Sequence, residues 1–327
     1  MVSPSTLGPS SSRTERSGHA CRATEPIRSS FDRLRTSGCT HALDATVAAF
    51  IVALVSAVPP PVTAQPPSLN EVLDRLGVYV RDYEDDLSMV VAQEDYQQWM
   101  HGQNASSNPM RYRRTLLSDF AFMRPLDNGP WVGFRDTFLV DSQPVRDRDS
   151  RLERLLAAGS RDGFEQAARI VEENARYNFG SDRVRRTINS PTLTVDFLHP
   201  RQRGRFSFRK AGEQRIDDRR VWKIDFLEHG QPPIIRTPGG PGQVTRGTVW
   251  VDPSNGEVLR TFLRVIPNAA LAAQARLTVN FRREAKLDLL VPSEMRESYA
   301  VRGGDIDGVA TYSNFRRFET SGRVLEK

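Results

Sequence analysis

Apolar residues recur every three or four positions between residues 68 and 86, the spacing that places them on one side of an α-helix. Ser68 and Glu71 have the spacing of a capping box, in which each side chain bonds the backbone N–H of the other residue. The pattern therefore predicts a first helix from about Ser68 to Asp86 with one apolar side to bury. That side consists of Leu69, Leu73, Leu76, Val80 and Tyr83, widened by Val72 and Tyr79.

From Leu87 onward, apolar residues alternate with polar ones, which is the period of a β-strand with one buried face. Strands are predicted at 87–99, 111–124 and 130–141. Two helices are predicted next, at Arg151–Ala158 and Gly163–Tyr177. After residue 190 the alternation returns, first at Leu193, Val195 and Phe197, and continues almost to the end of the chain.

The order of these elements predicts an α+β fold. The sequence contains about eleven strand patterns and three helix patterns, and no convincing β-α-β unit. Consecutive strands with short turns and one apolar face each are typical of an antiparallel meander. We expect a strongly curved antiparallel sheet, or open half-barrel, of about eleven strands with three helices on its concave face, forming one domain over residues 65–327.

The first 64 residues differ from the rest in composition. Residues 1–44 are rich in Ser, Arg, Thr and Pro, which indicates a disordered leader or a stretch upstream of the true translation start. Residues 45–57 form an uncharged, largely apolar run, shorter than the roughly 20 residues of a membrane span. Together with the small residues before Gln65, residues 45–64 resemble a signal-peptide core and cleavage region. This predicts export to the periplasm or the medium, with no stable membrane span after cleavage.

Cysteine positions and charge exclude several classes of function. Cys21 and Cys39 both precede the expected cleavage point, so the exported part would have no disulfide, thiolate metal site or cysteine nucleophile. The net charge of +6 is spread over 327 residues, too weak and interspersed for a nucleic-acid surface.

Catalytic and metal-binding patterns are absent from the sequence. The oxygen-rich stretch Asp252–Gly256 could be a calcium loop, but Leu263 stands where the bidentate glutamate of such a loop belongs, so a β-hairpin turn is the better interpretation. His101, His199 and His229 lack the spacing of a zinc site. We therefore predict no catalytic residue, no metal and no cofactor. A hydrolase with a dispersed site is the least favoured alternative.

The apolar strand faces carry the remaining candidate site. Its residues are Phe197, Phe206, Phe208, Trp222, Ile224, Phe226, Trp250 and Phe281. They are expected to point inward, where they either fill a core under the helices or line an apolar cavity for a lipid or acyl chain.

The hairpin at residues 247–260, of the form G-x-V-W-x-D-P-x-x-G-x-V-L-R, resembles the central hairpin of the periplasmic lipoprotein-carrier fold. This LolA/LolB-like group includes the N-terminal domain of the stress regulator RseB. The stretches "ARYNFG…RTINSPTLTVDFLHP" and "GVATYSNFRRF" look like a family of exported bacterial proteins of unassigned function. The carrier resemblance covers about residues 68–320 and implies an unclosed barrel whose helical lid encloses acyl chains.

These patterns favour an exported, non-catalytic protein that binds a lipid, a lipoprotein acyl chain or another apolar ligand. The alternative is an envelope protein-interaction or stress-sensor module with a filled core. Expected partners are an apolar small molecule or lipid, a lipoprotein or an envelope protein, and not a nucleic acid.

Overall fold

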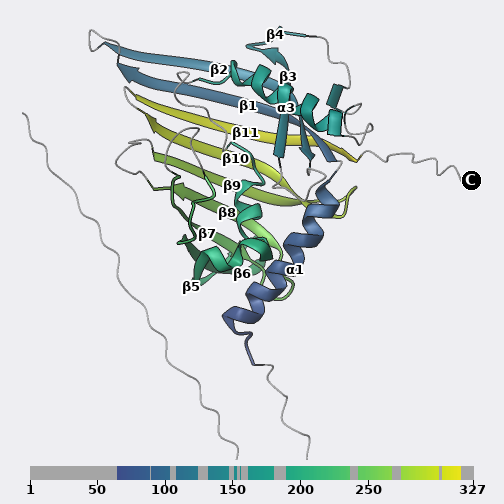
Figure 1. Cartoon of the computed structure of the whole chain (residues 1–327), viewed down its shortest axis with the longest axis vertical. Coiled ribbons are helices and arrows are strands. Elements are labelled where there is room, and N and C mark those ends of the chain that lie inside the picture. Colours follow the sequence, from purple (N-terminus) through teal and green to yellow (C-terminus); the bar gives the residue numbers. More distant parts are fainter. Residues whose placement is uncertain are drawn as a thin grey trace, which may run out of the picture. The chain divides into compact units, whose positions relative to one another are not determined.

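Antiparallel strands form one open sheet, and the helices lie on one of its faces (Figure 1). The computed structural model describes residues 65–88, 90–103, 108–123, 132–146, 151–152, 155, 161–179, 189–235, 242–266, 274–301 and 304–317. The expectations for residues 1–44 and 45–64 lie outside the described residues. No helix in the described part of the chain is both long and apolar enough to cross a membrane.

The strands are β1 (Val90–Gln103), β2 (Pro109–Met123), β3 (Val132–Val140), β4 (Gln143–Pro144), β5 (Phe206–Ile216), β6 (Arg219–Glu228), β7 (Thr245–Val251), β8 (Val258–Val265), β9 (Gln274–Glu284), β10 (Leu289–Val301) and β11 (Gly304–Arg317). The helices are α1 (Leu69–Leu87), α3 (Arg161–Ala175), α4 (Leu193–Phe197) and the 3-10 helix η1 (Pro200–Arg205).

The sheet has eleven strands in the order β4-β3-β2-β1-β11-β10-β9-β8-β7-β6-β5. All neighbours are antiparallel and follow each other in sequence, except that β1 pairs with β11. The sheet ends at β4 and β5, so it is not closed into a barrel. The predicted α+β class, the strand number and the open meander are confirmed.

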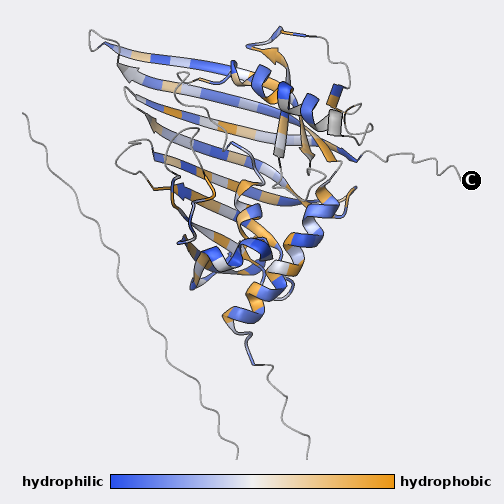
Figure 2. Cartoon of the chain, in the orientation of Figure 1, coloured by the Kyte–Doolittle hydropathy of each residue, from blue (hydrophilic) through white to orange (hydrophobic). Residues whose placement is uncertain are grey.

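Helix α1 packs against β7–β10 on one sheet face, called the inner face from here on. Its capping box is formed as predicted: Ser68 Oγ accepts a bond from Glu71 N, and Glu71 Oε2 accepts one from Ser68 N at 2.6 Å. The buried side of α1 joins strand residues such as Val249, Val279 and Met295 in one core. Colouring by hydropathy shows the alternation of apolar and polar residues along the strands (Figure 2).

The turn of the β7–β8 hairpin contacts α1 directly. Gly256 has a φ of +81°, and a Cβ atom there would lie 2.5 Å from the backbone carbonyl carbon of Arg75. Arg75 Nη1 donates to the carbonyl oxygen of Pro253 at 2.5 Å. The turn therefore requires glycine for its conformation and for its close approach to α1.

All three predicted helices are described in part or in full: α1 matches the first, Arg151, Leu152 and Leu155 are helical, and α3 corresponds to the segment predicted at 163–177. The strand predicted around Leu193–Phe197 is wrong, because this segment is the short helix α4. Its backbone bonds are local, as Asp196 N donates to Thr192 O at 3.0 Å and Leu198 N to Val195 O at 2.9 Å. A five-residue alternation cannot distinguish a strand from a buried turn of helix.

Candidate ligand-binding face

Seven of the eight predicted cavity residues lie in or against the inner-face core. Those fully enclosed are Phe197, Phe206, Trp222, Ile224, Phe226 and Phe281, and Phe208 is partly buried against them. They belong to α4, β5, β6 and β9, so the fold does bring together side chains from distant parts of the sequence. In the described part of the chain these side chains pack against one another and against α1. Together with α1 they fill this face.

Trp250 is the exception, and its predicted inward orientation is wrong. Trp222 and Ile224 lie opposite Val251 and Val249, whereas Trp250 lies opposite Lys223 and therefore on the other, outer face. The Lys223 ammonium and the Arg260 guanidinium lie 5.9 and 5.6 Å from the Trp250 ring centre. Alternation within β7 alone cannot give this result, because it separates two faces without saying which one is buried.

Aromatic rings cluster where β5 and β6 meet α4. The ring of Phe206 lies 5.8 Å from Phe197 in a stacked arrangement and 5.7 Å from Phe226 in an edge-to-face arrangement. Phe208 lies 6.2 Å from Phe206. Three of these rings belong to the sheet, while Phe197 belongs to α4. The short helix thus inserts one ring into an aromatic wall of the sheet.

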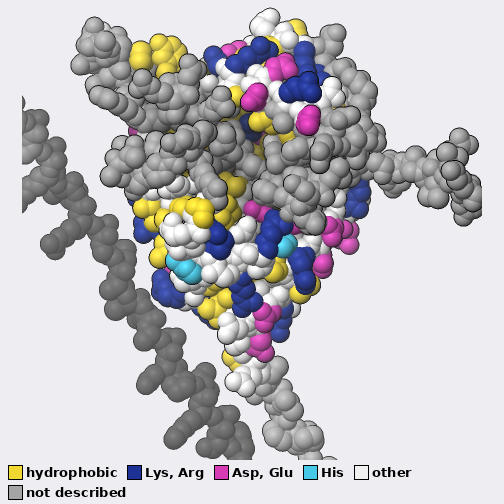
Figure 3. All heavy atoms as spheres, in the orientation of Figure 1, with side chains coloured by type: hydrophobic (Ala, Val, Ile, Leu, Met, Phe, Trp, Pro, Cys, Tyr) yellow, Lys and Arg dark blue, Asp and Glu magenta, His cyan; other side chains and the backbone are white. Residues whose placement is uncertain are grey.

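Phe197 is part of a segment, Thr192–Arg205, that comprises α4 and η1 and is called the strap here. Polar and charged groups attach the strap to α1: His199 Nε2 lies 3.6 Å from Glu84 Oε2, and Arg201 Nη2 lies 3.6 Å from Glu84 Oε1. Arg203 pairs with Asp74 of α1. In the view of Figure 1, the visible surface around α1 and the strap mixes basic and acidic side chains (Figure 3).

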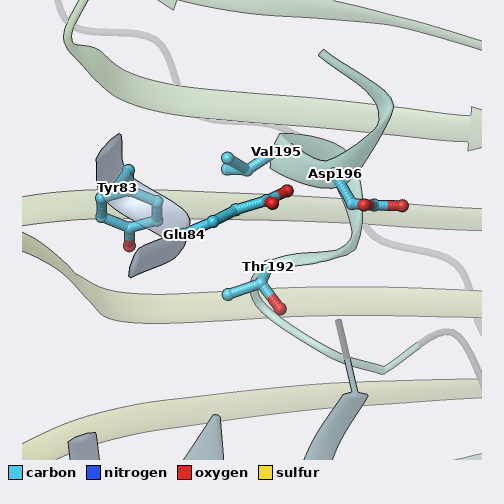
Figure 4. Close-up of a pocket in the computed structure, with 5 residues that line it drawn as sticks. All are labelled: Tyr83, Glu84, Thr192, Val195 and Asp196. Carbon is cyan, nitrogen blue, oxygen red and sulfur yellow. The ribbon is translucent and has the colours of Figure 1, made fainter. Parts of the chain in front are cut away.

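A small cavity of about 10 Å³ lies where the strap meets α1, lined by Tyr83, Glu84, Thr192, Val195 and Asp196. Figure 4 shows the Glu84 side chain extending from α1 toward Val195 and Asp196. Burial raises the pKa of Asp196, and the paired Arg201 opposes this effect. A cavity of this volume has room for about one water molecule, so it cannot hold an organic ligand.

A second, polar network is buried on the same inner face, around β1, β3 and β10. Arg135 of β3 pairs with Glu94 of β1, its Nη2 donating to Glu94 Oε1 at 2.7 Å. The guanidinium of Arg135 also lies 4.8 Å from the ring centre of Tyr96. Both charged side chains are almost fully buried. A buried pair of this kind is costly to separate, because either partner alone would be an uncompensated charge.

Glu297 of β10 extends the network. Its carboxyl group accepts hydrogen bonds from the hydroxyls of Tyr96 and Tyr299, the latter at 2.6 Å. Burial raises the pKa of Glu297 from 4.5 to about 8, opposed by the Tyr299 hydrogen bond and supported by the nearby Glu94 carboxylate. Gly308 makes room for it, since a Cβ atom there would lie 2.7 Å from Glu297 Oε1. Glu297 is therefore mainly protonated at neutral pH.

This network was not predicted from the sequence, because charged residues were expected at solvent-facing positions. The signal was present in the alternation: Glu94 and Gln98 stand in phase with the inward residues Ala92 and Tyr96 of β1. A polar residue in the apolar phase of a strand indicates a buried partner. The identity of that partner could not be read from sequence, because it depends on which strands are neighbours.

The Asp252–Gly256 stretch is a hairpin turn, as predicted. Asp252 Oδ1 accepts a bond from Ser254 N at 2.9 Å, and Asp252 Oδ2 accepts one from Arg219 Nη2 at 2.6 Å. Glu257 also pairs with Arg219, at 2.5 Å. Across the described residues, no group of three or more His, Cys, Asp or Glu side chains is arranged to hold a metal ion.

A hollow of about 310 Å³ lies along β1, β2 and β3, lined by Asp95, Gln97, Arg113, Thr115, Leu116, Leu117, Leu139 and Ser142. Asp95 is the one carboxylate among these described lining residues, and no histidine lines the hollow. The arrangement offers neither a carboxylate pair nor a Ser–His contact, so it gives no support to a hydrolase.

Comparison with known proteins gives matches in fold only. No protein-family model and no curated protein matches the chain. Among solved structures, the chain resembles a DUF1329 family protein from Desulfovibrio piger, with 13% identity over 79% of this chain and 94% of that one and a TM-score of 0.35. It also resembles a LolA superfamily protein from Nitrosomonas europaea, with 12% identity over 77% and 97% and a TM-score of 0.28.

A third match is LprF from Mycobacterium bovis, with 15% identity over 79% of this chain and all of that chain and a TM-score of 0.23. At these identities the likeness concerns the fold alone.

Proposed function

We propose that this is an exported, non-catalytic protein that binds an apolar chain, such as a lipid or lipoprotein acyl chain, against the aromatic wall of β5 and β6. The observation that carries the proposal is the position of the Phe197 side chain. Its ring projects from the strap onto the aromatic wall and stacks against Phe206. An apolar ligand would take the place of the Phe197 ring when the strap moves away from the sheet.

Hydrophobic free energies favour the replacement of the buried Phe197 ring by a long apolar ligand. Withdrawing Phe197 from its buried position costs about 1.5–3 kcal/mol of hydrophobic stabilisation. Each methylene of a ligand buried in its place contributes about 0.8 kcal/mol. A chain of roughly ten methylenes therefore offsets the loss of the ring, and its remaining contribution offsets the exposure of Val195 and Leu198, which are buried in the same strap.

The alternative function, an envelope protein-interaction or stress-sensor module, is supported by a different observation. The described residues fill the inner face, with Trp222, Ile224 and Phe281 each less than a tenth exposed. If the strap never moves, the aromatic wall is only a core, and binding must use another surface.

A disulfide between α1 and the strap separates these functions. A Cβ atom at Gly77 would lie 4.0 Å from the Cβ of Pro200, within the range of disulfides. We therefore design Gly77→Cys/Pro200→Cys in a chain whose Cys21 and Cys39 are replaced by serine, with Pro200→Cys alone as the control. Binding of the fluorescent apolar probe N-phenyl-1-naphthylamine and of palmitate is measured before and after reduction.

Apolar ligand binding that is weak in the oxidised double variant, returns on reduction and is unaffected by reduction in the control supports the proposal. Equal binding in both redox states would show that the strap does not control access. No binding in either state, together with native mass spectrometry that finds no co-purified lipid, would overturn the carrier function in favour of the interaction module.

A further inference from the structure

Three arginines lie side by side across the outer face of the sheet. Arg246 of β7 is the cross-strand partner of Arg264 of β8, and Arg264 is the partner of Arg276 of β9. Neighbouring strands are about 4.8 Å apart, so the row spans roughly 10 Å. Like charges placed directly opposite each other in a sheet are destabilising. The row therefore costs stability.

The row is part of a larger basic surface without local compensation. Lys223 and Arg260 stand on the same outer face, on either side of Trp250. Within the described ranges, none of these five basic side chains takes part in an ion pair. Arg260 bonds the amide oxygen of Asn280 at 2.7 Å, and Arg264 bonds that of Gln274 at 3.4 Å; both partners are neutral.

The nearby acidic groups on this face have other basic partners. Asp225 pairs with Arg209 at 2.8 Å, and Glu294 pairs with Arg296 at 2.7 Å. Neither carboxylate neutralises the row. The surface formed by Lys223, Arg246, Arg260, Arg264 and Arg276, called the basic surface here, therefore presents uncompensated positive charge.

Apolar side chains are interleaved with the basic surface. Leu227 is the cross-strand partner of Arg246 and is 45% exposed. Phe262 stands between Arg260 and Arg264 on β8, and both Phe262 and Trp250 are half-buried. Basic groups mixed with accessible Trp, Phe and Leu side chains are typical of proteins that lie at a membrane surface.

We propose that the outer face of β6–β9 is a docking surface for a membrane containing anionic phospholipids. The arginines would contact lipid phosphates, for which the guanidinium fork is well suited, and Leu227 and Trp250 would reach the boundary of the acyl region. The exposed Leu227 and the half-buried Phe262 and Trp250 favour a lipid surface over an acidic protein, which would need only the charges. This surface is opposite the proposed ligand site and does not depend on that function.

The test is co-sedimentation with sucrose-loaded vesicles of phosphatidylcholine alone or with about 40 mol% of the anionic lipid phosphatidylglycerol. The variant is Arg264→Gln/Arg276→Gln. Its matched control, Arg215→Gln/Arg220→Gln, removes the same charge from a pair of cross-strand partners near the β5–β6 turn. Each basic residue at an anionic membrane contributes about a fivefold change in partition, so the variant should lose on the order of 25-fold.

Binding to the anionic vesicles only, weakened in 0.5 M salt and by the variant but not by its control, supports the proposal. The variant should also melt at the same or a higher temperature than the parent, because it relieves like-charge repulsion. Equal loss in both double variants would show that only net charge matters and would overturn the specific surface. Absence of vesicle binding combined with binding of polyglutamate to the same arginines would assign the surface to an acidic protein instead.

Discussion

Replacing Glu297 with glutamine should remove a defined part of the pH dependence of stability. The carboxyl group is buried between Tyr96 and Tyr299, and its pKa is raised from 4.5 to about 8. A glutamine has the same shape as the protonated acid and can keep both tyrosine contacts, one of them by donating from its amide. Glu297→Gln should therefore fold like the parent at pH 6.

Whether Glu297 stabilises the protein more at low or at high pH depends on whether the folded or the unfolded state holds its proton. Between pH 4.5 and 8 the unfolded chain releases the Glu297 proton, whereas the folded protein retains it. The contribution of this group to stability is thus fully present below pH 4.5 and is lost as pH rises through 8. One pKa unit corresponds to about 1.4 kcal/mol, so the shift sets an upper limit of roughly 5 kcal/mol on the loss.

Urea unfolding at pH 5, 6, 7, 8 and 9 measures this quantity. The parent should lose stability relative to Glu297→Gln by up to about 1.4 kcal/mol per pH unit through this window. Glu172→Gln, a change of the same chemistry at an exposed position of α3, should retain the parent slope. Identical slopes for the parent and Glu297→Gln would refute the assignment of a buried, protonated carboxyl group.

Three other substitutions test buried contacts: the Arg135–Glu94 pair, the Gly256 turn and the Phe197 ring. Arg135→Met should cost about 3–5 kcal/mol in urea unfolding, because it leaves the buried Glu94 carboxylate without the Arg135 guanidinium. Adding Glu94→Leu should recover part of that loss. A loss below about 1 kcal/mol would mean that the pair is not buried as described. Gly256→Ala should lower the thermal midpoint clearly, since alanine at a φ of +81° costs about 1–2 kcal/mol before its contact with Arg75 is counted. The control is Gly204→Ala, where nothing lies within 4 Å of the added Cβ atom. Equal midpoints for the two variants would contradict the reasoning. Phe197→Ala should cost about 3–5 kcal/mol of stability through the cavity it leaves. An increase in amide hydrogen exchange confined to the strap would locate the loss of stability there. Unchanged stability would show that the ring is not packed against Phe206.

Much of the fold could be predicted from the sequence because the relevant signals are local. The capping box at Ser68, the stripe of α1 and the alternation in β1–β3 and β6–β11 each depend on residues within one element. Turn chemistry was also decisive at Asp252–Gly256, where aspartate, proline and glycine specify a hairpin. Where the local signal was short, as at Leu193–Phe197, the predicted strand was wrong.

The candidate sites depended on the tertiary structure, because register decides which side chains meet. Tyr96 and Glu297 are 201 residues apart in sequence, and only the pairing of β1 with β11 and of β11 with β10 brings them together. The outer row of Arg246, Arg264 and Arg276 likewise arises from the alignment of three strands. Alternation assigned each residue to one of two faces of a strand, but the positions of α1 and α3 decided which face is buried, and this is why Trp250 lies outside and Glu94 inside.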